Sequence, residues 1–196
     1  MSLLVLDQNI TESLSGLTRD NSNLQKIIYV VATYPIFLVP ITLLWLFCQK
    51  TSRHLAVKTF ILTIFTWQVI SKSVGEFFYT NYGFRDRPLA FSGLQEFLFE
   101  QPQKSFPSDH AAVLILVTLA LFYYRQKKLA WVFLAATLLS SLARVMIGFH
   151  FVGDILGGML IGLVGFGLLV ALDQPLQKLL EKLSGLIGQK NESKNV

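Results

Sequence analysis

Cysteine and charged residues are scarce in this chain of 196 residues. Cys48 is the single cysteine, so no intramolecular disulfide can form, and a disulfide-stapled fold is excluded. Charged residues make up 15% of the chain, whereas soluble domains contain about 25%. Hydrophobic residues reach 53%, and so apolar a chain can bury enough surface to offset the entropy of ordering, which excludes intrinsic disorder.

A membrane accounts for the rest of the composition. The mean hydropathy is +0.52, the formal net charge is +5 and the sequence pI is near 9.4. A basic chain could bind nucleic acid, but apolarity and basicity together are typical of an integral membrane protein. We therefore expect membrane lipids, and no nucleic acid, among its partners.

Five apolar segments have lengths that suit transmembrane helices. A bilayer core roughly 30 Å thick needs about 20 helical residues. The segments are Ile27–Cys48, Thr59–Tyr82, Pro107–Tyr124, Leu129–Ile147 and Phe151–Leu172. They predict an all-α integral membrane bundle of about five transmembrane helices, with residues 1–196 forming a single domain. The long connection from Asn81 to Phe106 is too long for a bare turn.

Both chain ends lie outside this bundle, which we place at residues 24–172. Leucines and isoleucines recur at roughly helical spacing in residues 1–23, which favours an amphipathic helix on the membrane interface, although a frayed terminus is an alternative. The same stretch has no features of a signal peptide, so we expect none to be removed. The pattern of residues 173–196 predicts an amphipathic tail with a polar end.

The distribution of cations predicts the orientation. Alternate connections and the tail would carry the larger group: Lys50, Arg53, Lys58, Arg125, Lys127, Lys128, Lys178, Lys182, Lys190 and Lys194. The other side would carry Arg19, Lys26, Arg85, Arg87, Lys104 and Arg144. Because cations favour the cytoplasmic side, we expect the C-terminus in the cytoplasm, with the N-terminus and the 81–106 connection outside.

Charged and polar residues near membrane spans are costly, so they indicate functional sites. They fall into three clusters. The first comprises Lys72, Glu76 and residues 85–88, the second is residues 106–110, and the third comprises Arg144, His150 and Asp154. Counting the spans places all three clusters at the same face of the membrane. We therefore expect them to converge in a single pocket.

The second cluster has the features of an anion site at a helix N-terminus. Pro107 suits a first helical turn, because the N–H that proline lacks has no partner there in any case. The free amides and the helix dipole then face an anion near Ser108, and His110 lies one turn inside that end.

The third cluster combines a histidine with an acid and a cation. His150 and Asp154 are four residues apart, and would share one face if the helix began there. Asp154 could then fix the tautomer of His150 and leave its other nitrogen as a nucleophile or base. Arg87 and Arg144 suit bidentate phosphate contacts. Since the chain has only three histidines and its acids are dispersed, we expect no metal and no other cofactor.

These motifs resemble those of a known family. Arg87-Pro88, then Pro107-Ser108-Asp109-His110, then Arg144-x5-His150-x3-Asp154 are similar to the three signatures of the type 2 phosphatidic acid phosphatase superfamily. Their order and spacing are similar to bacterial undecaprenyl-diphosphate phosphatases of the bacitracin-resistance type. The likeness implies a bacterial plasma membrane, an active site on the extracytoplasmic face, and a polyprenyl diphosphate or another lipid phosphate as substrate.

The resemblance also implies residue roles. His150 would form a phosphohistidine while Asp154 orients it. His110 would protonate the leaving group and then activate the water that releases phosphate. Arg87, Arg144 and Ser108 would hold the phosphoryl oxygens.

Two positions depart from the family pattern. The family places a lysine ahead of Arg-Pro with six residues between them, where this chain has Thr80, so Lys72 or Arg85 would have to supply that cation to the phosphate. Lys72 could equally neutralise Glu76 inside the bundle. Asp109 stands where many members have glycine. The resemblance implies that an aspartate at this position is typical of the diphosphatase branch and that it lies at the phosphate site.

Three functions compete at this stage. The first is hydrolysis of undecaprenyl diphosphate to the monophosphate and phosphate, in the recycling of the lipid carrier for the cell wall. The second is the same chemistry on phosphatidylglycerol phosphate, phosphatidate or a lipid A phosphate. The third is a non-catalytic lipid-phosphate binder or transporter, which the presence of two histidines and Asp154 disfavours, because binding needs only the cations and the helix end. The sequence predicts no oligomeric state.

Overall fold

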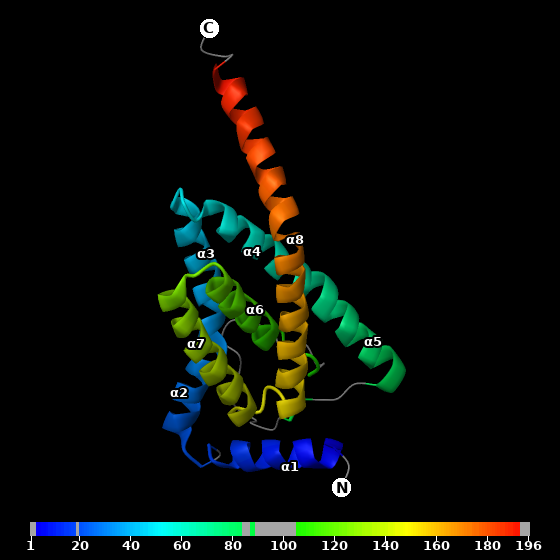
Figure 1. Cartoon of the computed structure of the whole chain (residues 1–196). Coiled ribbons are helices and arrows are strands. Elements are labelled where there is room, and N and C mark those ends of the chain that lie inside the picture. The colour runs from blue at the N-terminus through cyan, green and yellow to red at the C-terminus, as the bar shows by residue number, and fades with distance from the viewer. Residues whose placement is uncertain (1–2, 19, 84–86, 89–104, 193–196) are drawn as a thin grey trace.

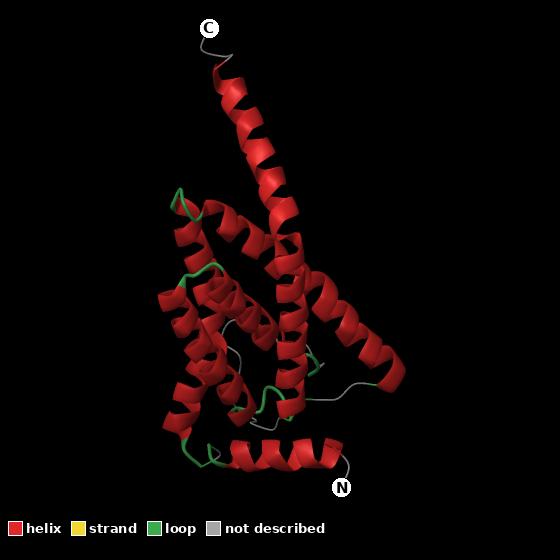
Figure 2. Ribbon diagram, viewed as in Figure 1, coloured by secondary structure: helices red, strands yellow, loops and turns green. Residues whose placement is uncertain are grey.

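The structure is a computed structural model, which describes residues 3–18, 20–83, 87–88 and 105–192. Within those ranges all regular secondary structure is helical, as Figures 1 and 2 show. The expected all-α fold is confirmed. The remaining residues, which include Arg85 and most of the 81–106 connection, lie outside the described ranges.

The helices pass up and down one bundle. The elements in chain order are α1 Leu3–Gly16, α2 Ser22–Thr33, η1 Tyr34–Phe37, α3 Leu38–Cys48, α4 Arg53–Phe65, η2 Thr66–Ser71, α5 Lys72–Tyr82, α6 Asp109–Tyr123, α7 Lys127–Met146 and α8 Val152–Glu192. The 3-10 turn η1 joins α2 to α3, and the π-helical η2 joins α4 to α5, so each of these groups forms one continuous path. The described chain thus makes the five passes that the hydropathy predicted.

Four of these passes have the length and apolar character of membrane spans. They are Ser22–Cys48, Arg53–Tyr82, Lys127–Met146 and Val152–Gly185, whereas α6 is a shorter apolar helix. Proline is tolerated in the first pass, where Pro35 lies in η1 and the backbone adjusts locally to 3-10 geometry. The chain is therefore a multi-pass membrane protein.

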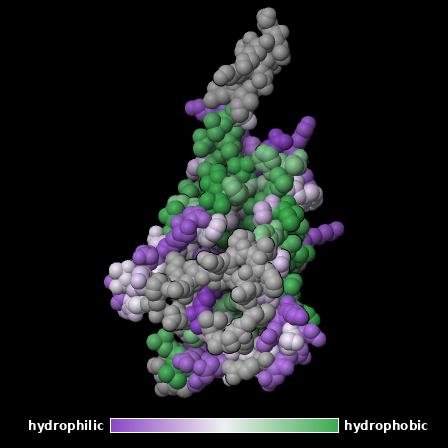
Figure 3. Space-filling model, turned by 180° about the vertical axis from the view of Figure 1, so that it is seen from behind, coloured by the Kyte–Doolittle hydropathy of each residue, from purple (hydrophilic) through white to green (hydrophobic). Residues whose placement is uncertain are grey.

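The bundle carries large apolar side chains outward and small hydroxyl groups inward. Ile41, Leu44, Trp131 and Leu160 are all more than half exposed, which suits contact with lipid. Thr59, Thr118, Thr137 and Ser140 are fully or almost fully buried, as expected where small polar residues allow close helix packing. Figure 3 shows a broad apolar area along the flank that carries α8.

Glycines let α6 approach α8 closely. A Cβ atom built on Gly158 would collide with the carbonyl oxygen of Ser108, and one on Gly162 would collide with that of Ala112. Because both obstacles are backbone atoms, neither position leaves room for a side chain. The glycines therefore serve packing within the bundle.

The first and last described segments of the chain are both helical. Helix α1 lies across the end of the bundle at which α7 finishes and α8 begins (Figure 1). Leu3–Gly16 of the expected amphipathic segment is therefore helical, and its place on the membrane interface stays a prediction. Helix α8 does not stop near Leu172. It continues through Pro175 to Glu192 and projects beyond the bundle, so no boundary separates the expected tail from the last span.

Candidate functional site

The loop between α7 and α8 presents His150 at the end of the bundle. Gly148 adopts φ +78°, a conformation that suits glycine, immediately after the C-cap of α7. The amide of Phe149 donates to the carbonyl of Arg144 (2.9 Å), and that of Gly148 donates to Val145 (3.0 Å). This pair of bonds is a Schellman motif, which satisfies the last carbonyls of α7 and reverses the chain. The reversal returns His150 to the side chain of Arg144.

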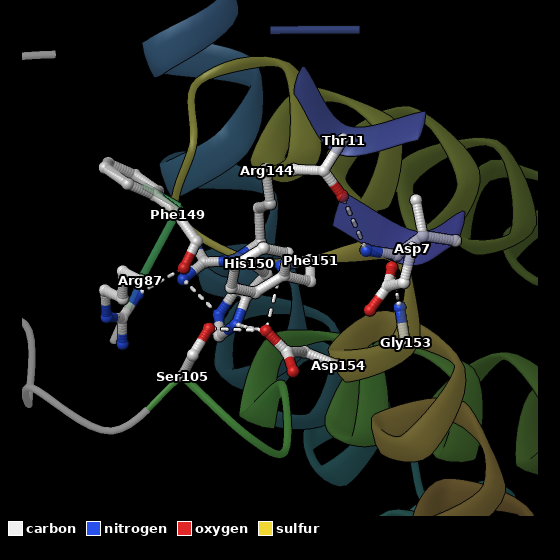
Figure 4. Close-up of polar contacts among 11 residues, drawn as sticks. Asp7, Thr11, Arg87, Ser105, Arg144, Phe149, His150, Phe151, Gly153 and Asp154 are labelled. Carbon is white, nitrogen blue, oxygen red and sulfur yellow. Dashed lines mark hydrogen bonds and ion pairs between the residues drawn. The ribbon is translucent and has the colours of Figure 1, made fainter. Parts of the chain in front are cut away.

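His150 lies between a guanidinium group and a carboxylate (Figure 4). The Nη2 atom of Arg144 is 3.2 Å from Nε2 of His150, and Oδ2 of Asp154 is 3.7 Å from Nδ1. Arginine can only donate, so Nε2 must accept, and the proton of a neutral ring lies on Nδ1. The arrangement holds an unprotonated Nε2 and directs the N–H toward Asp154. Helix α8 begins at Val152, so His150 precedes the helix that carries Asp154.

Asp154 is fixed by neighbours on both sides. Its Oδ2 accepts hydrogen bonds from the hydroxyl of Ser105 and from the amide of Phe151, the latter at 2.8 Å. The bond to Phe151 resembles one half of a capping box, because an acid in the first turn reaches back to the amide before the helix. The side chain of Asp154 is fully buried.

Ser108 and His110 face the site from the start of α6. Ser108 is the N-cap of that helix, and its amide donates to the carbonyl of Asp154 at 3.1 Å. The Oγ atom of Ser108 and Nε2 of His110 are buried and make no hydrogen bond with the described residues. His110 lies within electrostatic range of His150, Arg144 and Arg87, and its ring hydrogen-bonds to the backbone of Thr33. The expected convergence of the second and third clusters is therefore observed.

Pro107 lies outside the helix that it was expected to open. Helix α6 begins at Asp109, because Ser108 has an extended backbone (φ −79°, ψ 107°) that allows its amide to reach Asp154. The anion-site geometry is unchanged, since the free amides of α6 still begin next to Ser108.

Two arginines border the site. Arg144 is only 2% exposed, and its Nη1 donates to the carbonyl of Ala32 at 3.0 Å. Such deep burial shows that Arg144 does not extend toward the lipid interface. The Nη1 atom of Arg87 donates to the carbonyl of Phe149 at 2.9 Å, immediately before His150.

Two predicted phosphate-binding residues point elsewhere. Lys72 is exposed, with its ammonium nitrogen 5.9 Å from the centre of the Trp67 ring. It lines a separate cavity with Glu76 on the outer side of α5. The carboxylate of Asp109 accepts a hydrogen bond from the hydroxyl of Ser71 at 2.5 Å. Neither side chain therefore joins the His150 cluster in this structure, and Arg85 lies outside the described residues.

Several residues of the site gave no signal in the sequence. Ser105 belongs to an irregular connection, and its role depends on a contact across 49 positions. Gly148 could have been noticed, because glycine directly after a helix is typical of a Schellman motif. Asp7 and Thr11 of α1 accept hydrogen bonds from the first amides of α8, at 3.0 and 3.4 Å.

An apolar groove of about 930 Å³ leads away from the cluster. Helix α1 contributes Leu4, Leu6 and Ile10 to its lining, and α5 contributes Phe78, Tyr79 and Tyr82. Ser105 and Asp154 line its polar end. The site therefore combines a buried polar cluster with an adjoining apolar groove, which is the shape that an amphiphilic ligand requires.

The electrostatics keep His150 uncharged. Burial lowers the pKa of the His150 imidazole from 6.5 to about 4; the neighbouring carboxylate of Asp154 opposes this shift, and Arg144 and Arg87 add to it. A neutral imidazole at neutral pH has a lone pair on Nε2 and can act as a nucleophile. No three histidine, cysteine, aspartate or glutamate side chains gather into a possible metal site within the described ranges. Independence from metal ions stays a prediction.

The fold and site define a class: an all-helical membrane protein with a cluster of histidines and arginines at one end of the bundle. The family model of the PAP2 superfamily matches residues 47–178, which include Arg87, Ser108, His110, Arg144, His150 and Asp154. The chain belongs to the PAP2 superfamily.

Curated relatives are similar to the chain in sequence, and solved structures are similar to it in fold. The chain is 26% identical over 161 residues to undecaprenyl-diphosphatase BcrC of Bacillus subtilis (81% of this chain, 80% of the relative). It is 29% identical over 132 residues to the putative undecaprenyl-diphosphatase YbjG of Escherichia coli (66% and 64%). The fold resembles the PAP2-type phosphatidylglycerolphosphate phosphatase of Bacillus subtilis (TM-score 0.64, 21% identity, 88% and 87% covered). It also resembles LpxE of Aquifex aeolicus (TM-score 0.62, 22% identity, 85% and 95% covered).

Proposed function

We propose that this protein is a membrane phosphatase that hydrolyses undecaprenyl diphosphate to undecaprenyl phosphate and inorganic phosphate. One observation carries the proposal: Nε2 of His150 is unprotonated beside Arg144, while its Nδ1 faces Asp154. A site that only binds a phosphate needs cations and a helix end, but it does not need a histidine held in one tautomer. This pattern favours covalent catalysis.

The first step transfers the phosphoryl group to His150. Nε2 attacks the terminal phosphorus, and the bond between that phosphorus and the bridging oxygen breaks. Asp154 stabilises the positive charge that develops on the ring. Arg144 withdraws from Nε2 and, with Arg87, Ser108 Oγ and the amides of α6, holds the phosphoryl oxygens as their charge grows. The product is a phosphohistidine.

His110 supplies and removes the protons. In the first step it donates a proton to the bridging oxygen, which leaves on undecaprenyl phosphate. The neutral ring then takes a proton from a water molecule, and the resulting hydroxide attacks the phosphohistidine. The bond from phosphorus to Nε2 breaks, inorganic phosphate leaves and His150 is restored.

The groove between α1 and α5 supports a lipid substrate. Its lining is largely apolar, and it ends at Ser105 and Asp154, beside the reacting cluster. A soluble phosphate ester would gain nothing from such a surface, whereas the first part of an isoprenoid chain would bury apolar area against it. The names of the curated relatives favour undecaprenyl diphosphate over other lipid phosphates.

The test is release of phosphate by the purified full-length protein in detergent with EDTA present. We expect turnover of undecaprenyl diphosphate to exceed that of phosphatidylglycerol phosphate and phosphatidate. We also expect phosphate from labelled substrate to bind the protein covalently, and His150→Ala to abolish both signals. Turnover that persists in His150→Ala would remove the proposed nucleophile, and a requirement for metal ions would contradict the mechanism.

His54→Ala is the matched control. His54 is the third histidine of the chain, and it lies next to Gln177 of α8, far from the cluster. Its removal should leave turnover within about twofold of the unchanged protein, because substitutions away from the reacting cluster have small effects. Preference for phosphatidylglycerol phosphate in the same assay would retain the chemistry and change the substrate.

We further propose that the site opens on the extracytoplasmic face. The single cysteine tests this orientation. Cys48 is exposed and is the last residue of α3, and α3 ends at the opposite end of the bundle from α1 (Figure 1). A membrane-impermeant maleimide should label Cys48 only after the cells are permeabilised. In a Cys48→Ser background, Ser13→Cys on the exposed surface of α1 should be labelled in intact cells. The reverse pattern would place the site in the cytoplasm.

A further inference from the structure

We infer that the α1 segment positions the active site by hydrogen bonding to both ends of the loop that carries His150. Asp7 is its principal positioning residue. The inference rests on the proposed function, because it treats His150 as the reacting group. It goes beyond that function because α1 lies outside the matched residues 47–178 and carries none of the family motifs.

Helix α1 turns its polar side toward the protein. Thr11 and Thr18, at the inner side of this segment, are completely buried. Leu4, Leu17 and Ile10 are between 41% and 67% exposed. A helix that merely floated on the interface would bury its leucines in lipid and leave its polar groups in water. Here the polar groups are used by the protein instead.

Those groups bind both helices that flank the loop. Oδ1 of Asp7 accepts from the amide of Gly153 at 3.0 Å, and Oγ1 of Thr11 accepts from that of Val152 at 3.4 Å (Figure 4). At the other end, the hydroxyl of Thr18, in the turn directly after α1, donates to the carbonyl of Met146 at 3.1 Å. The first contacts cap the N-terminus of α8, and the last satisfies a terminal carbonyl of α7.

The loop that these contacts hold is short and contains the reacting group. Only residues 147–151 separate α7 from α8, and His150 is one of them. The amide that binds Asp7 belongs to the residue before Asp154, so a shift of this helix end would move the carboxylate relative to Nδ1 of His150. That separation is 3.7 Å and must shorten to form a hydrogen bond. Small displacements here therefore act directly on catalysis.

The experiment compares Asp7→Leu, which removes the acceptor, with Asp7→Asn, which keeps an oxygen acceptor of the same length. In Asp7→Leu we expect kcat to fall about tenfold or more while KM for undecaprenyl diphosphate changes less than about twofold, because the contact acts on the transition state and not on substrate binding. Asp7→Asn should recover most of this loss. Equal losses in the two variants would overturn the inference.

Two further variants separate positioning from general damage. Glu12→Leu makes the same chemical change at an exposed acid of α1 whose carboxylate accepts a hydrogen bond from Gln8 of the same helix. In this variant kcat should remain within about twofold of the unchanged protein. Thr11→Val removes the second acceptor with little change of shape, and should lower kcat in the same sense as Asp7→Leu. If Glu12→Leu reduces kcat as much as Asp7→Leu, α1 has no specific positioning role.

Hydrogen–deuterium exchange provides a readout that does not depend on turnover. The peptide that contains Val152 and Gly153 should exchange faster in Asp7→Leu than in Asp7→Asn, with α6 unaffected. Unchanged exchange would show that Asp7 does not hold the start of α8, and would overturn the inference. If the unchanged protein releases no phosphate from any lipid while Asp7→Leu still loses this protection, the proposed function fails. The structural part of the inference, that Asp7 holds the start of α8, is then still supported.

Discussion

The hydroxyl group of Ser105 donates a hydrogen bond to the carboxylate of Asp154, although 49 positions separate the two residues. Both side chains are almost completely buried. The bond leaves Asp154 oriented toward Nδ1 of His150 by two donors, the serine hydroxyl and the amide of Phe151. Ser105 therefore controls an acid that the sequence assigned to catalysis without indicating what holds it.

Replacement of Ser105 tests this control. In Ser105→Ala we expect kcat to fall by about tenfold to a hundredfold, because a hydrogen bond to a charged group contributes about 1.5–3 kcal/mol. KM should change little, since Ser105 acts through Asp154. The measurement is steady-state phosphate release. Ser141→Ala is the control: Ser141 is also buried, and its Oγ has no hydrogen-bond partner in the described part of the chain. Equal kcat in both variants would contradict this role.

The acid limb of the pH profile should reflect the environment of His150. Burial lowers the pKa of this ring to about 4, so protonation should remove the nucleophile only near that pH and not near the ordinary value of 6.5. We expect no loss of kcat/KM as the pH falls through 6.5, and a decrease at about 4 to 5. A circular dichroism spectrum over the same range checks that the protein stays folded. A limb near 6.5 would show that His150 is not buried as described.

Asp154→Asn should alter the same profile in a defined direction. The carboxylate raises the pKa of His150 against the effect of burial, so its loss should move the acid limb to still lower pH. The maximum rate should also fall by roughly 10³–10⁴, the effect seen when an acid that fixes a catalytic histidine tautomer becomes an amide. Phosphate release between pH 4 and 9 measures both changes. A limb that moves upward would contradict the assignment.

Much of the fold and part of the site could be predicted because both depend on helix length. Five apolar segments fixed the number of passes, and the parity of these passes brought Ser108, His110, Arg144 and His150 to one end. Neither inference needs side-chain detail. The positions of the helix ends were less accurate, since the first turn of α6 depends on the bond between Ser108 and the backbone of Asp154.

The rest depends on packing that a single sequence does not encode in a visible pattern. Lys72 suggested a site because a charge in a span is costly, but the rotation of α5 buries Ser71 and Gly75 and leaves Lys72 outside. That rotation is set by neighbouring helices. Similarly, Asp7 and Ser105 are ordinary polar residues until the chain folds and places them next to α8.

Gly158 should tolerate no side chain. In Gly158→Ala the new Cβ would collide with the carbonyl oxygen of Ser108 and lie 3.1 Å from Cβ of Ala111. We expect a loss of about 1–3 kcal/mol in the free energy of unfolding and a lower kcat, because α6 would move away with Ser108 and His110. Gly167→Ala on the same helix is the control, since nothing lies within 4 Å of its Cβ. Thermal unfolding in detergent and phosphate release measure the two effects, and equal stability of both variants would contradict the close contact.

The ion pair between Lys58 and Asp173 should stabilise the opposite end of the bundle without influencing catalysis. Nζ of Lys58 lies 2.5 Å from Oδ1 of Asp173, their side chains are 5% and 13% exposed, and the hydroxyl of Tyr124 donates to the same oxygen. The contacts join α4 and α8 to the connection between α6 and α7. Asp173→Asn should lower the free energy of unfolding by about 3–5 kcal/mol, because it leaves the lysine charge buried without its partner.

The double replacement Lys58→Met with Asp173→Leu should be less destabilised than Asp173→Asn, since it buries no unpaired charge. Thermal unfolding in detergent measures stability, and kcat should remain within about twofold of the unchanged protein in both variants. Glu181→Gln, at an exposed acid further along α8, should change neither quantity. A large fall in kcat without a loss of stability in Asp173→Asn would instead show that this end of the bundle is coupled to His150.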